Sequence, residues 1–440
     1  MRVFLECTAT YHFDGNTGIQ RVVRNIVNTS AGVGRELGLD CQPIIYDKDI
    51  GFCPISRLVP PDPTRKETFG QLIRRVLSPS LKRMGLLGAV QWVLKMGRAV
   101  GRGFRKLTPM EIAEPVRFQA GDVMLLMDSS WTTPYWRDLE AAQQKGVRVG
   151  FLIYDLIPML QPEVTNCLIL AAYPKWWHRV CRTADFIQCI SQTVCRDVEE
   201  WFQEHNLPER SRPVECGWFH LGRDLDGCAV AEEVRPEFHR VFSREPAPAT
   251  YLMVGSINPR KNHLLVLDAF DRLWAEGSEA RLAIIGNIGW TTEAFERRVK
   301  KHPQLKRRLF WYNKVSDAEL DFAYRNARAM ITASIAEGFN LPIVEALERG
   351  CPVYASDFPV HREVGGTHAA YFSADGPEGL YQLLHNETAR SLEELRKRAG
   401  TFQWPDWPDS CRQLLENLCS QLNRNVRPKA AVSAKLSIGV

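Results

Sequence analysis

The sequence has no run of about eighteen uncharged apolar residues, the length that a membrane-spanning helix needs, so we expect no such helix. It has 12 cysteines but no CxxC pair, which favours free thiols in a reducing compartment over a disulfide framework. Its histidines show no HxxxH or HExxH spacing, and we predict no metal site. The N-terminus reaches an acid at Glu6, which is typical of a first strand and not of a signal peptide.

The composition is that of an ordinary globular protein with one unusual segment. The chain has 440 residues, 45% of them hydrophobic and 24% charged, a length that predicts two or three domains. Its formal net charge of +5 is unevenly distributed. Residues 65–106 hold eleven basic residues and one acid, a net charge of +10, so the rest of the chain carries −5. The protein therefore combines a basic insert with an acidic remainder.

Part of this basic insert has the pattern of an amphipathic helix. The apolar residues that fall near one helical face are Leu86, Val90, Val93, Leu94, Val100 and Phe104. The cations that lie roughly opposite are Lys95, Arg98, Arg102 and Arg105. This arrangement suits a helix on an anionic membrane surface, which we expect as a partner of the insert. An ordinary surface helix, weakened by nearby glycines, is the alternative; we expect no nucleic-acid partner, because no recognition motif accompanies the patch.

Short apolar runs alternate with longer amphipathic stretches. The predicted strands are Arg2–Cys7, Val123–Met127, Val147–Tyr154, Phe186–Ile190, Tyr251–Val254, Leu282–Ile285, Ala329–Thr332 and Pro352–Ala355. The alternation predicts an α/β fold with two doubly wound, Rossmann-like domains that face an interdomain cleft. We expect them at residues 1–225 and 250–403, with a linker at 226–249, a C-terminal helix at 404–424 that packs back on the first domain, and a flexible tail at 425–440.

Two carboxylates eight residues apart surround a predicted helix start. The segment Glu337-Gly338-Phe-Asn-Leu-Pro342 follows a predicted strand and opens a helix that ends before Gly350. Gly338 would let the backbone approach a ligand, and free N–H groups at the helix start favour an anion. Glu337 and Glu345 are placed to reach hydroxyl groups at two ends of one ligand. The alternative is a pair of acids that the helix dipole favours.

A second loop supplies adjacent cations. Gly255 ends one predicted strand, and Arg260 and Lys261 follow in the loop before a predicted helix at Leu264–Trp274. A guanidinium fork beside a point charge suits a diphosphate, although a solvated surface pair is the alternative. Gly286, at the end of the next predicted strand, is placed to line the same pocket.

Together the two segments resemble the retaining nucleotide-sugar glycosyltransferases of family 4, which have the GT-B fold of two Rossmann-like domains. The resemblance rests on Glu337-x7-Glu345 within EGFNLP, on the G-x4-RKN loop from Gly255, and on the order of these segments. It covers the C-terminal half well and the N-terminal half more loosely. It implies that Arg260 and Lys261 hold the donor diphosphate and stabilise the charge that develops on it as it leaves.

The same resemblance implies that Glu337 contacts the donor sugar and Glu345 the ribose. The donor-binding residues it implies are Gly18, Gly255, Gly286, Gly338, Phe339, Asn340, Leu341 and Glu345. It implies no metal and no other cofactor. The donor sugar would be linked to GDP or UDP.

The N-terminal half offers looser matches. The loop Thr17-Gly18-Ile-Gln20-Arg21 resembles the family's glycine-containing first loop, which lies between donor phosphate and acceptor. Tyr154-Asp155 resembles a segment that usually reads His-Asp, so a tyrosine stands where the family has a histidine. We assign Asp155 to catalysis with Arg260, Lys261 and Glu337; a strand-end aspartate that caps a turn is the alternative. The acceptor-side residues that we predict are Thr17, Gln20, Arg21, Tyr154 and Asp128.

The expected function is transfer of a hexose from a nucleoside-diphosphate sugar to a hydroxyl of a lipid-linked saccharide, with retained configuration, in bacterial surface-polysaccharide assembly. We expect a cytoplasmic protein at the inner face of the cytoplasmic membrane. A nucleotide-sugar epimerase of the same fold and a catalytically inactive nucleotide-sugar-binding protein are the alternatives. A nicotinamide oxidoreductase is disfavoured because the first strand lacks a GxGxxG motif.

Overall fold

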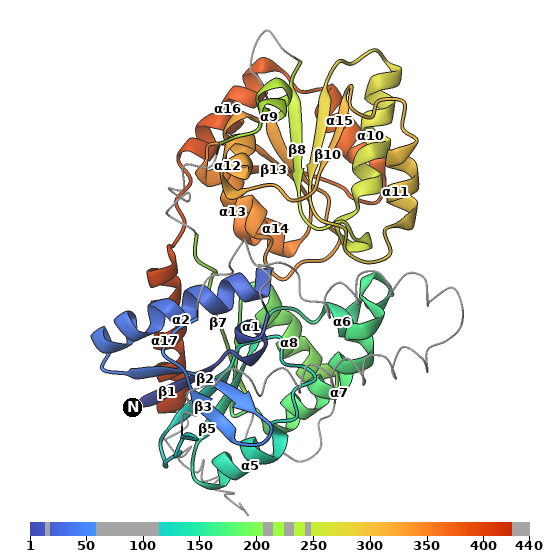
Figure 1. Ribbon diagram of the computed structural model, residues 1–440. Coiled ribbons are helices and arrows are strands. Elements are labelled where there is room, and N and C mark those ends of the chain that lie inside the picture. Colours follow the sequence, from blue (N-terminus) through green and yellow to red (C-terminus); the bar gives the residue numbers. More distant parts are fainter. Residues whose placement is uncertain (14–17, 59–113, 206–213, 224–232, 243–247, 425–440) are drawn as a thin grey trace, which may run out of the picture.

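The computed structural model describes residues 1–13, 18–58, 114–205, 214–223, 233–242 and 248–424 (Figure 1). The basic insert at 65–106, the tail at 425–440 and Thr17 lie outside the described residues, so the expectations placed on them stay predictions. In the part of the chain that is described, no helix is both long and apolar enough to cross a membrane. The described cysteines are free thiols.

The described N-terminal domain is built on a seven-stranded sheet with the order β3-β2-β1-β4-β5-β6-β7. The strands are β1 (Arg2–Glu6), β2 (Asp40–Asp47), β3 (Gly51–Pro54), β4 (Val123–Leu126), β5 (Arg148–Ile153), β6 (Phe186–Cys189) and β7 (Glu215–Trp218). All neighbours pair in parallel except β2 and β3, which are antiparallel. The helices are α1 (Thr8–Tyr11), α2 (Gly18–Glu36), α5 (Trp136–Gln144), α6 (Ile157–Leu160), α7 (Cys167–Thr183) and α8 (Gln192–Glu204).

The described C-terminal domain has a six-stranded parallel sheet with the order β10-β9-β8-β11-β12-β13. The strands are β8 (Thr250–Val254), β9 (Arg281–Ile285), β10 (Leu309–Tyr312), β11 (Ala329–Thr332), β12 (Val353–Ser356) and β13 (Ala369–Phe372). The helices are α9 (Pro236–Val241), α10 (His263–Ala275), α11 (Glu293–Lys300), α12 (Asp317–Asn326), α13 (Leu341–Glu348), α14 (Pro359–Gly365), α15 (Pro377–His385) and α16 (Ala389–Gly400). The predicted α/β class with two doubly wound domains is confirmed.

The central strands are buried on both faces because helices cover both sides of each sheet. Strands β4, β6, β11 and β12 are buried at every position, which explains why their sequences are rich in apolar residues. Close packing also explains why one position inside β5 is a glycine. A Cβ on Gly150 would lie 2.0 Å from the ring of Phe186 in the neighbouring strand, so this position has room only for glycine.

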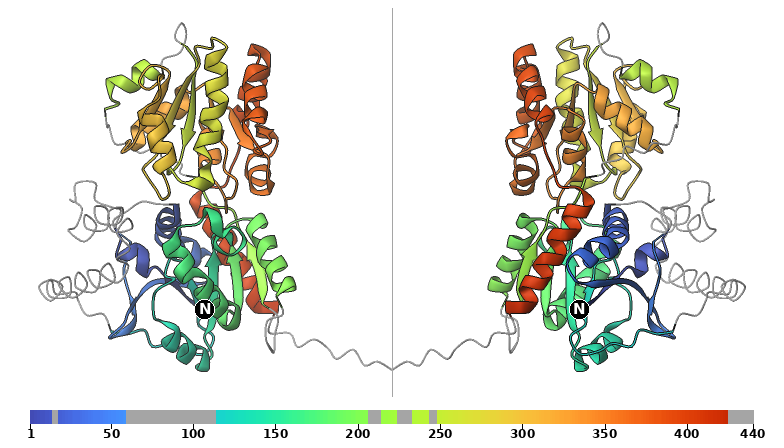
Figure 2. Two further views of the ribbon diagram at one scale, coloured as in Figure 1. Left: turned by 90° about the vertical axis from the view of Figure 1, so that its right-hand side faces the viewer. Right: turned by 90° about the vertical axis from the view of Figure 1, so that its left-hand side faces the viewer.

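The two domains lie end to end, and helix α17 (Trp407–Arg424) descends from the second domain along the first (Figures 1 and 2). Its apolar face packs on α2 and β7, where Asn417 Nδ2 donates to the carbonyl of Trp218 at 2.6 Å. Gly222 permits this crossing, since a Cβ there would lie 2.6 Å from Trp407 Cα. The C-terminal helix therefore contacts the N-terminal domain.

The segment predicted as a linker contains folded structure. Helix α9 lies within residues 226–249, and its Phe238 is fully buried together with the adjacent Phe242. Arg235 pairs with Glu319 of α12 and fixes the start of α9 to the second domain. This described part of the expected linker therefore belongs to the core of the C-terminal domain. Sequence analysis missed it because α9 is short and begins after a proline-containing, mixed-charge stretch.

Candidate functional site

Four of the predicted site residues meet at a cavity of about 150 Å³ between the domains. Asp128, Tyr154 and Asp155 line it from the N-terminal domain, and Arg260 and Trp290 line it from the C-terminal domain. The three N-terminal residues follow the carboxyl ends of β4 and β5, where ligands of doubly wound sheets bind.

Arg260, Lys261 and Glu337 form one buried ion cluster. The adjacent strands β8 and β11 deliver them, since the cations follow β8 and the carboxylate follows β11. Each cation pairs with one oxygen of Glu337, and Arg260 Nη1 also donates to the carbonyl of Ala336 at 2.7 Å. The loop is held by Asn258, whose Oδ1 accepts from Lys261 N at 3.2 Å.

The charges of this cluster depend on one another. Burial raises the pKa of Glu337, but Arg260 and Lys261 outweigh it and lower the pKa to about 2. Burial lowers the pKa of the Lys261 ammonium, which Glu337 partly restores. Burial also opposes the charge of Arg260, yet Glu337 and Asp155 leave its pKa raised. Glu337 is therefore a permanent anion that holds two buried cations in place.

Asn340 links this cluster to the start of α13. It adopts a left-handed conformation with φ 76°, and its Oδ1 accepts from Lys261 Nζ at 3.3 Å. Its Nδ2 donates to Thr332 Oγ1 at 2.9 Å and to His361 Nε2 at 2.7 Å. Burial lowers the pKa of His361 to about 4, so this histidine is neutral and can accept through Nε2 while Nδ1 donates to Ser356 O. Sequence analysis did not identify His361 as a partner.

Asp155 faces Arg260 across the cavity. Its Oδ1 accepts from Ile157 N at 3.1 Å. This is the contact predicted by the alternative interpretation, in which Asp155 caps a turn at the end of the strand. Burial raises the pKa of Asp155, and Arg260 only partly offsets that rise. Beside it, the Tyr154 hydroxyl donates to the carbonyl of Met127 at 2.8 Å, and Tyr154 thus ties the ends of β4 and β5 together.

Gly338 lies against the backbone of the other domain, whereas its expected approach to a ligand stays a prediction. A Cβ at this position would lie 1.9 Å from the carbonyl oxygen of Tyr154 in the other domain. The carbonyl of Gly338 accepts from Ser191 Oγ at 2.8 Å, again across the interface. The glycine is therefore required by contact between the domains.

The other predicted donor-side residues lie at three places: the ends of β8 and β9, the start of α13, and the start of α2. Gly255 (φ 147°) and Gly286 lie against each other at the ends of β8 and β9, where a Cβ on Gly286 would lie 1.9 Å from Gly255 O. Phe339 is buried and packs against both His220 and Trp404, and Leu341 begins α13. Gly18 begins α2, and a Cβ there would meet no described atom within 4 Å. The structure thus places packing constraints on Gly286 and Phe339.

Arg21, which we predicted on the acceptor side, contacts the C-terminal domain. Its Nη1 donates to Glu345 Oε1 at 2.6 Å, so a residue of α2 pairs with one of α13 across the cleft. Glu345 Oε2 accepts from the Tyr324 hydroxyl at 2.8 Å. Gln20, the neighbour of Arg21, instead contacts Ser129 of its own domain, at 3.3 Å.

A second carboxylate, Glu6, lies beside Asp128, which lines the cavity. Asp128 accepts from Thr10 N at 2.5 Å and from Ser129 N at 2.7 Å. Glu6 accepts from Thr8 N at 2.9 Å and from Ser130 Oγ at 3.1 Å. Burial and then the charge of Asp128 raise the pKa of Glu6 to about 7. We did not predict Glu6 as a site residue. The usable signal was an acid at the carboxyl end of β1, the strand that pairs with β4 before Asp128.

This raised pKa predicts a pH-dependent stability. Between about pH 4.5 and 7 the folded chain holds a proton on Glu6 that the unfolded chain has released, so the wild-type free energy of unfolding should fall as pH rises. Glu6→Gln lacks this proton. From pH 5 to 8 we expect the N-terminal domain of the wild type to lose about 3 kcal/mol relative to Glu6→Gln in urea denaturation. Parallel pH profiles of the two proteins would contradict a raised pKa.

Glu363 of α14 joins the two domains at another edge of the interface. Its carboxylate accepts from Gln192 N at 2.7 Å, Thr193 N at 2.8 Å and Thr193 Oγ1 at 2.6 Å, which are groups at the start of α8. His220 Nε2 lies 2.9 Å from the same carboxylate. The contact places an anion at a helix N-terminus, where the free N–H groups and the dipole favour it.

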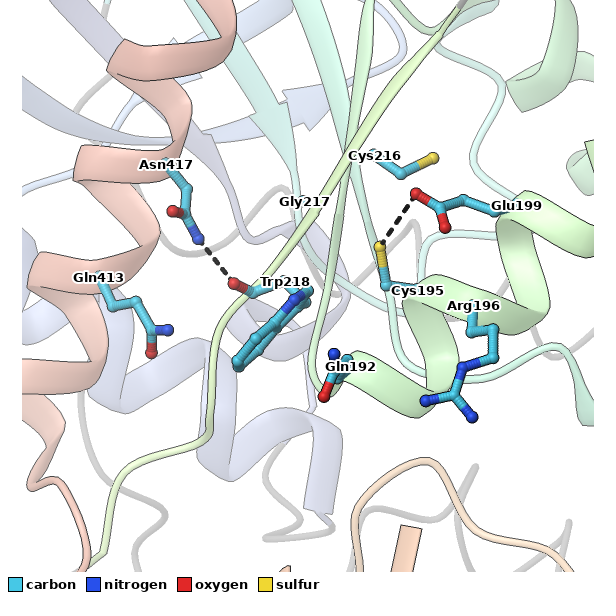
Figure 3. A pocket seen from close by; sticks show the side chains of 9 residues that line it. All are labelled: Gln192, Cys195, Arg196, Glu199, Cys216, Gly217, Trp218, Gln413 and Asn417. Carbon is cyan, nitrogen blue, oxygen red and sulfur yellow. Dashed lines mark hydrogen bonds between the residues drawn. The ribbon is translucent and has the colours of Figure 1, made fainter. Parts of the chain in front are cut away.

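A larger cavity of about 400 Å³ lies at the β7 edge of the N-terminal sheet (Figure 3). Figure 3 shows Trp218 of β7 between Gln413 of α17 and Gln192 of α8, with Arg196 farther along α8. None of the residues that we predicted for the site lines it. Among the described residues, no group of three or more side chains could hold a metal ion.

Comparisons with known proteins agree with this geometry. Residues 234–399 match the model of the family glycosyl transferases group 1. Over 308 residues, 69% of this chain, the sequence is 32% identical to the serotype-specific mannosyltransferase WbdA of Escherichia coli, of which the match covers 38%. A 137-residue stretch, 31% of the chain, is 29% identical to the O-antigen chain mannosyltransferase RfbU of Salmonella typhimurium and covers 37% of it. The chain thus spans well under half the length of these relatives.

Solved structures show the fold. Anabaena HepE in complex with UDP and glucose superposes with a TM-score of 0.57 at 12% identity, covering 96% of this chain and 100% of that one. Sucrose-phosphate synthase from Thermosynechococcus elongatus gives a TM-score of 0.57 at 14% identity, covering 96% and 99%. Residues 234–399 are therefore a domain of the family glycosyl transferases group 1, within a chain that has the two-domain GT-B fold.

Proposed function

We propose that this chain transfers a hexose from a nucleoside-diphosphate sugar to a saccharide hydroxyl, with retained configuration. The observation that carries the proposal is the interdomain cavity, which Arg260 of one domain and Asp155 of the other both line. A donor bound to the C-terminal domain would meet an acceptor held by the N-terminal domain there. The relatives named above are a serotype-specific mannosyltransferase and an O-antigen chain mannosyltransferase, which supports a role in polysaccharide assembly and favours mannose as the hexose.

The donor diphosphate would bind at Arg260 and Lys261. Both side chains are largely buried, and electrostatic stabilisation of a leaving group is strongest where water is excluded. Because the pKa of Glu337 is about 2, this residue stays ionised and would accept hydrogen bonds from sugar hydroxyls without donating a proton. The nucleotide would be GDP or UDP, with its ribose at Glu345 and no additional cofactor.

On the opposite side, Asp155 would bind the reacting hydroxyl or the transferred sugar. Its raised pKa makes the carboxylate a stronger hydrogen-bond acceptor than an exposed aspartate, so it would orient that hydroxyl. No carboxylate is placed as a separate nucleophile in this proposal. The departing phosphate would take the acceptor proton on the same face of the sugar, which retains the configuration.

One assay tests the proposal. The full chain is incubated with GDP- and UDP-hexoses, with and without a lipid-linked saccharide, while nucleotide release and the anomeric configuration of the product are measured. We expect acceptor-dependent release with one donor and a product of unchanged configuration. Sugar isomerisation without acceptor would favour the epimerase alternative, and the absence of turnover with every donor would favour the inactive binding protein.

We also propose that residues 65–106 bind an anionic membrane surface, which would bring a cytoplasmic enzyme to a lipid-linked acceptor at the inner face of the cytoplasmic membrane. The support is the net charge of +10 in this segment. Flotation with liposomes should require anionic lipid and weaken as salt rises. A chain without residues 65–106 should stay unbound; flotation that survives this deletion would refute the assignment.

A further inference from the structure

Arg21 makes a contact between the domains that its position in the first loop did not lead us to expect. Its guanidinium and the carboxylate of Glu345 are separated by 324 positions in the sequence and meet at 2.6 Å. The exposed fractions of the two side chains are 28% and 13%. This partial burial distinguishes the pair from a surface salt bridge, which contributes little because water screens it.

The carboxylate of Glu345 is held at both oxygens. Arg21 binds Oε1, and the hydroxyl of Tyr324 donates to Oε2 at 2.8 Å. Tyr324 is itself fixed, because it is buried in the core and the guanidinium of Arg349 lies 5.6 Å from its ring centroid. Two partners on two different helices therefore determine where this carboxylate points.

Both partners leave acceptor positions on the Glu345 carboxylate unused. A carboxylate offers about four acceptor positions, and Arg21 and Tyr324 together use two of them. The remaining lone pairs can each accept one hydroxyl of a ribose. A nucleotide can thus bind Glu345 without displacing Arg21.

We propose that Arg21 is a positioning residue for the donor nucleotide. It orients Glu345 toward the ribose hydroxyls, and because it belongs to the N-terminal domain it couples nucleotide binding to contact between the domains. The inference rests on the proposed function, which assigns the ribose to Glu345. In the opposite arrangement, Arg21 and the ribose compete for Glu345, and the ribose has to displace Arg21 to bind. Loss of Arg21 would then tighten nucleotide binding.

Calorimetric titration of the full chain separates these arrangements. GDP and UDP are titrated first, and the tighter one is compared with its 2′,3′-dideoxy analogue, which lacks the ribose hydroxyls. We expect Arg21→Ala to weaken the ribonucleotide by about tenfold, as for loss of one charge-assisted hydrogen bond, and to leave the dideoxy analogue unchanged. Arg21→Lys should recover part of the affinity, because it keeps the charge without the planar fork.

Two further variants complete the design. Tyr324→Phe removes only the other hydrogen bond to Glu345 and should give a smaller loss with the same dependence on ribose hydroxyls, even if Arg21→Ala folds poorly. Arg412→Ala breaks the exposed pair with Glu36 at the far end of the same helix and should bind both nucleotides like the wild type.

An equal loss of affinity for the ribonucleotide and the dideoxy analogue would assign Arg21 to interface stability alone. Tighter binding would show that Arg21 competes with the ribose for Glu345. Either result overturns the inference and leaves the proposed function intact. If the wild type binds neither GDP nor UDP, the proposed function fails and the inference fails with it.

Discussion

Replacing both Arg260 and Lys261 with alanine should lower kcat/KM by about a thousandfold or more, because the charge on the departing diphosphate would lose both of its partners. The expected loss is larger than for a surface pair, since both cations are buried and held by Glu337. Steady-state kinetics with the preferred donor measure the effect, and titration with the free nucleoside diphosphate should show weakened binding as well.

The double variant leaves Glu337 buried without its cations, so its folding must be checked. Arg260→Lys is the conservative companion, because it keeps the positive charge and removes the fork; we expect a loss of about tenfold in kcat/KM. Arg272→Ala is the matched control on the following helix, where Arg272 forms an exposed pair with Glu378. Unaltered nucleotide binding by a folded double variant would mean that the phosphates bind elsewhere.

Gly338→Ala should disable the contact between the domains while each domain stays folded. The added Cβ would lie 1.9 Å from the carbonyl oxygen of Tyr154, and neither backbone can yield easily. Overpacking of this kind costs about 1–3 kcal/mol, which corresponds to a fall in kcat/KM of about tenfold to a hundredfold if catalysis requires this contact.

Kinetics and small-angle scattering together check this prediction. We expect a lower kcat/KM and a larger radius of gyration, with thermal unfolding close to that of the wild type. Gly400→Ala is the control, because a Cβ there would meet no described atom within 4 Å. Full activity of Gly338→Ala would show that the interdomain contact of this structure does not belong to the catalytic form.

Much of the fold was predictable because central parallel strands are buried on both faces and therefore rich in apolar residues. Strands β4, β6, β11 and β12 have this pattern, and each was predicted to within one or two residues. Strands β2, β3, β7, β10 and β13 were not predicted. Four of them, β3, β7, β10 and β13, are four residues long and lie at the edges of the sheets, where many positions are only half-buried. Strand β2 is longer, but exposed and half-buried positions interrupt its apolar pattern.

The ion cluster was predictable for a related reason. Arg260 and Glu337 are 77 residues apart, but each follows a strand, and parallel strands that neighbour one another present their carboxyl ends together. The pairing of Glu337 with both cations in one cluster was not foreseen. It depends on side-chain burial, which the pattern of motifs does not show.

Contacts between the domains could not be predicted from the sequence. The pairing of Arg21 with Glu345 and the approach of Gly338 to Tyr154 depend on how two separately folded units are placed. No periodicity within either unit encodes that placement. For this reason we assigned Arg21 to the acceptor and explained Gly338 by a ligand, whereas the structure gives both residues a partner in the opposite domain.

The most direct test of the central claim is a structure of the chain with its preferred nucleoside diphosphate bound. The account predicts that the phosphate oxygens lie within hydrogen-bond distance of Arg260 and Lys261, in the cavity that Asp155 lines from the other domain. It also predicts that the ribose hydroxyls contact Glu345 while Arg21 remains paired with it. Phosphates bound away from both cations, for example in the cavity beside Trp218, would contradict it.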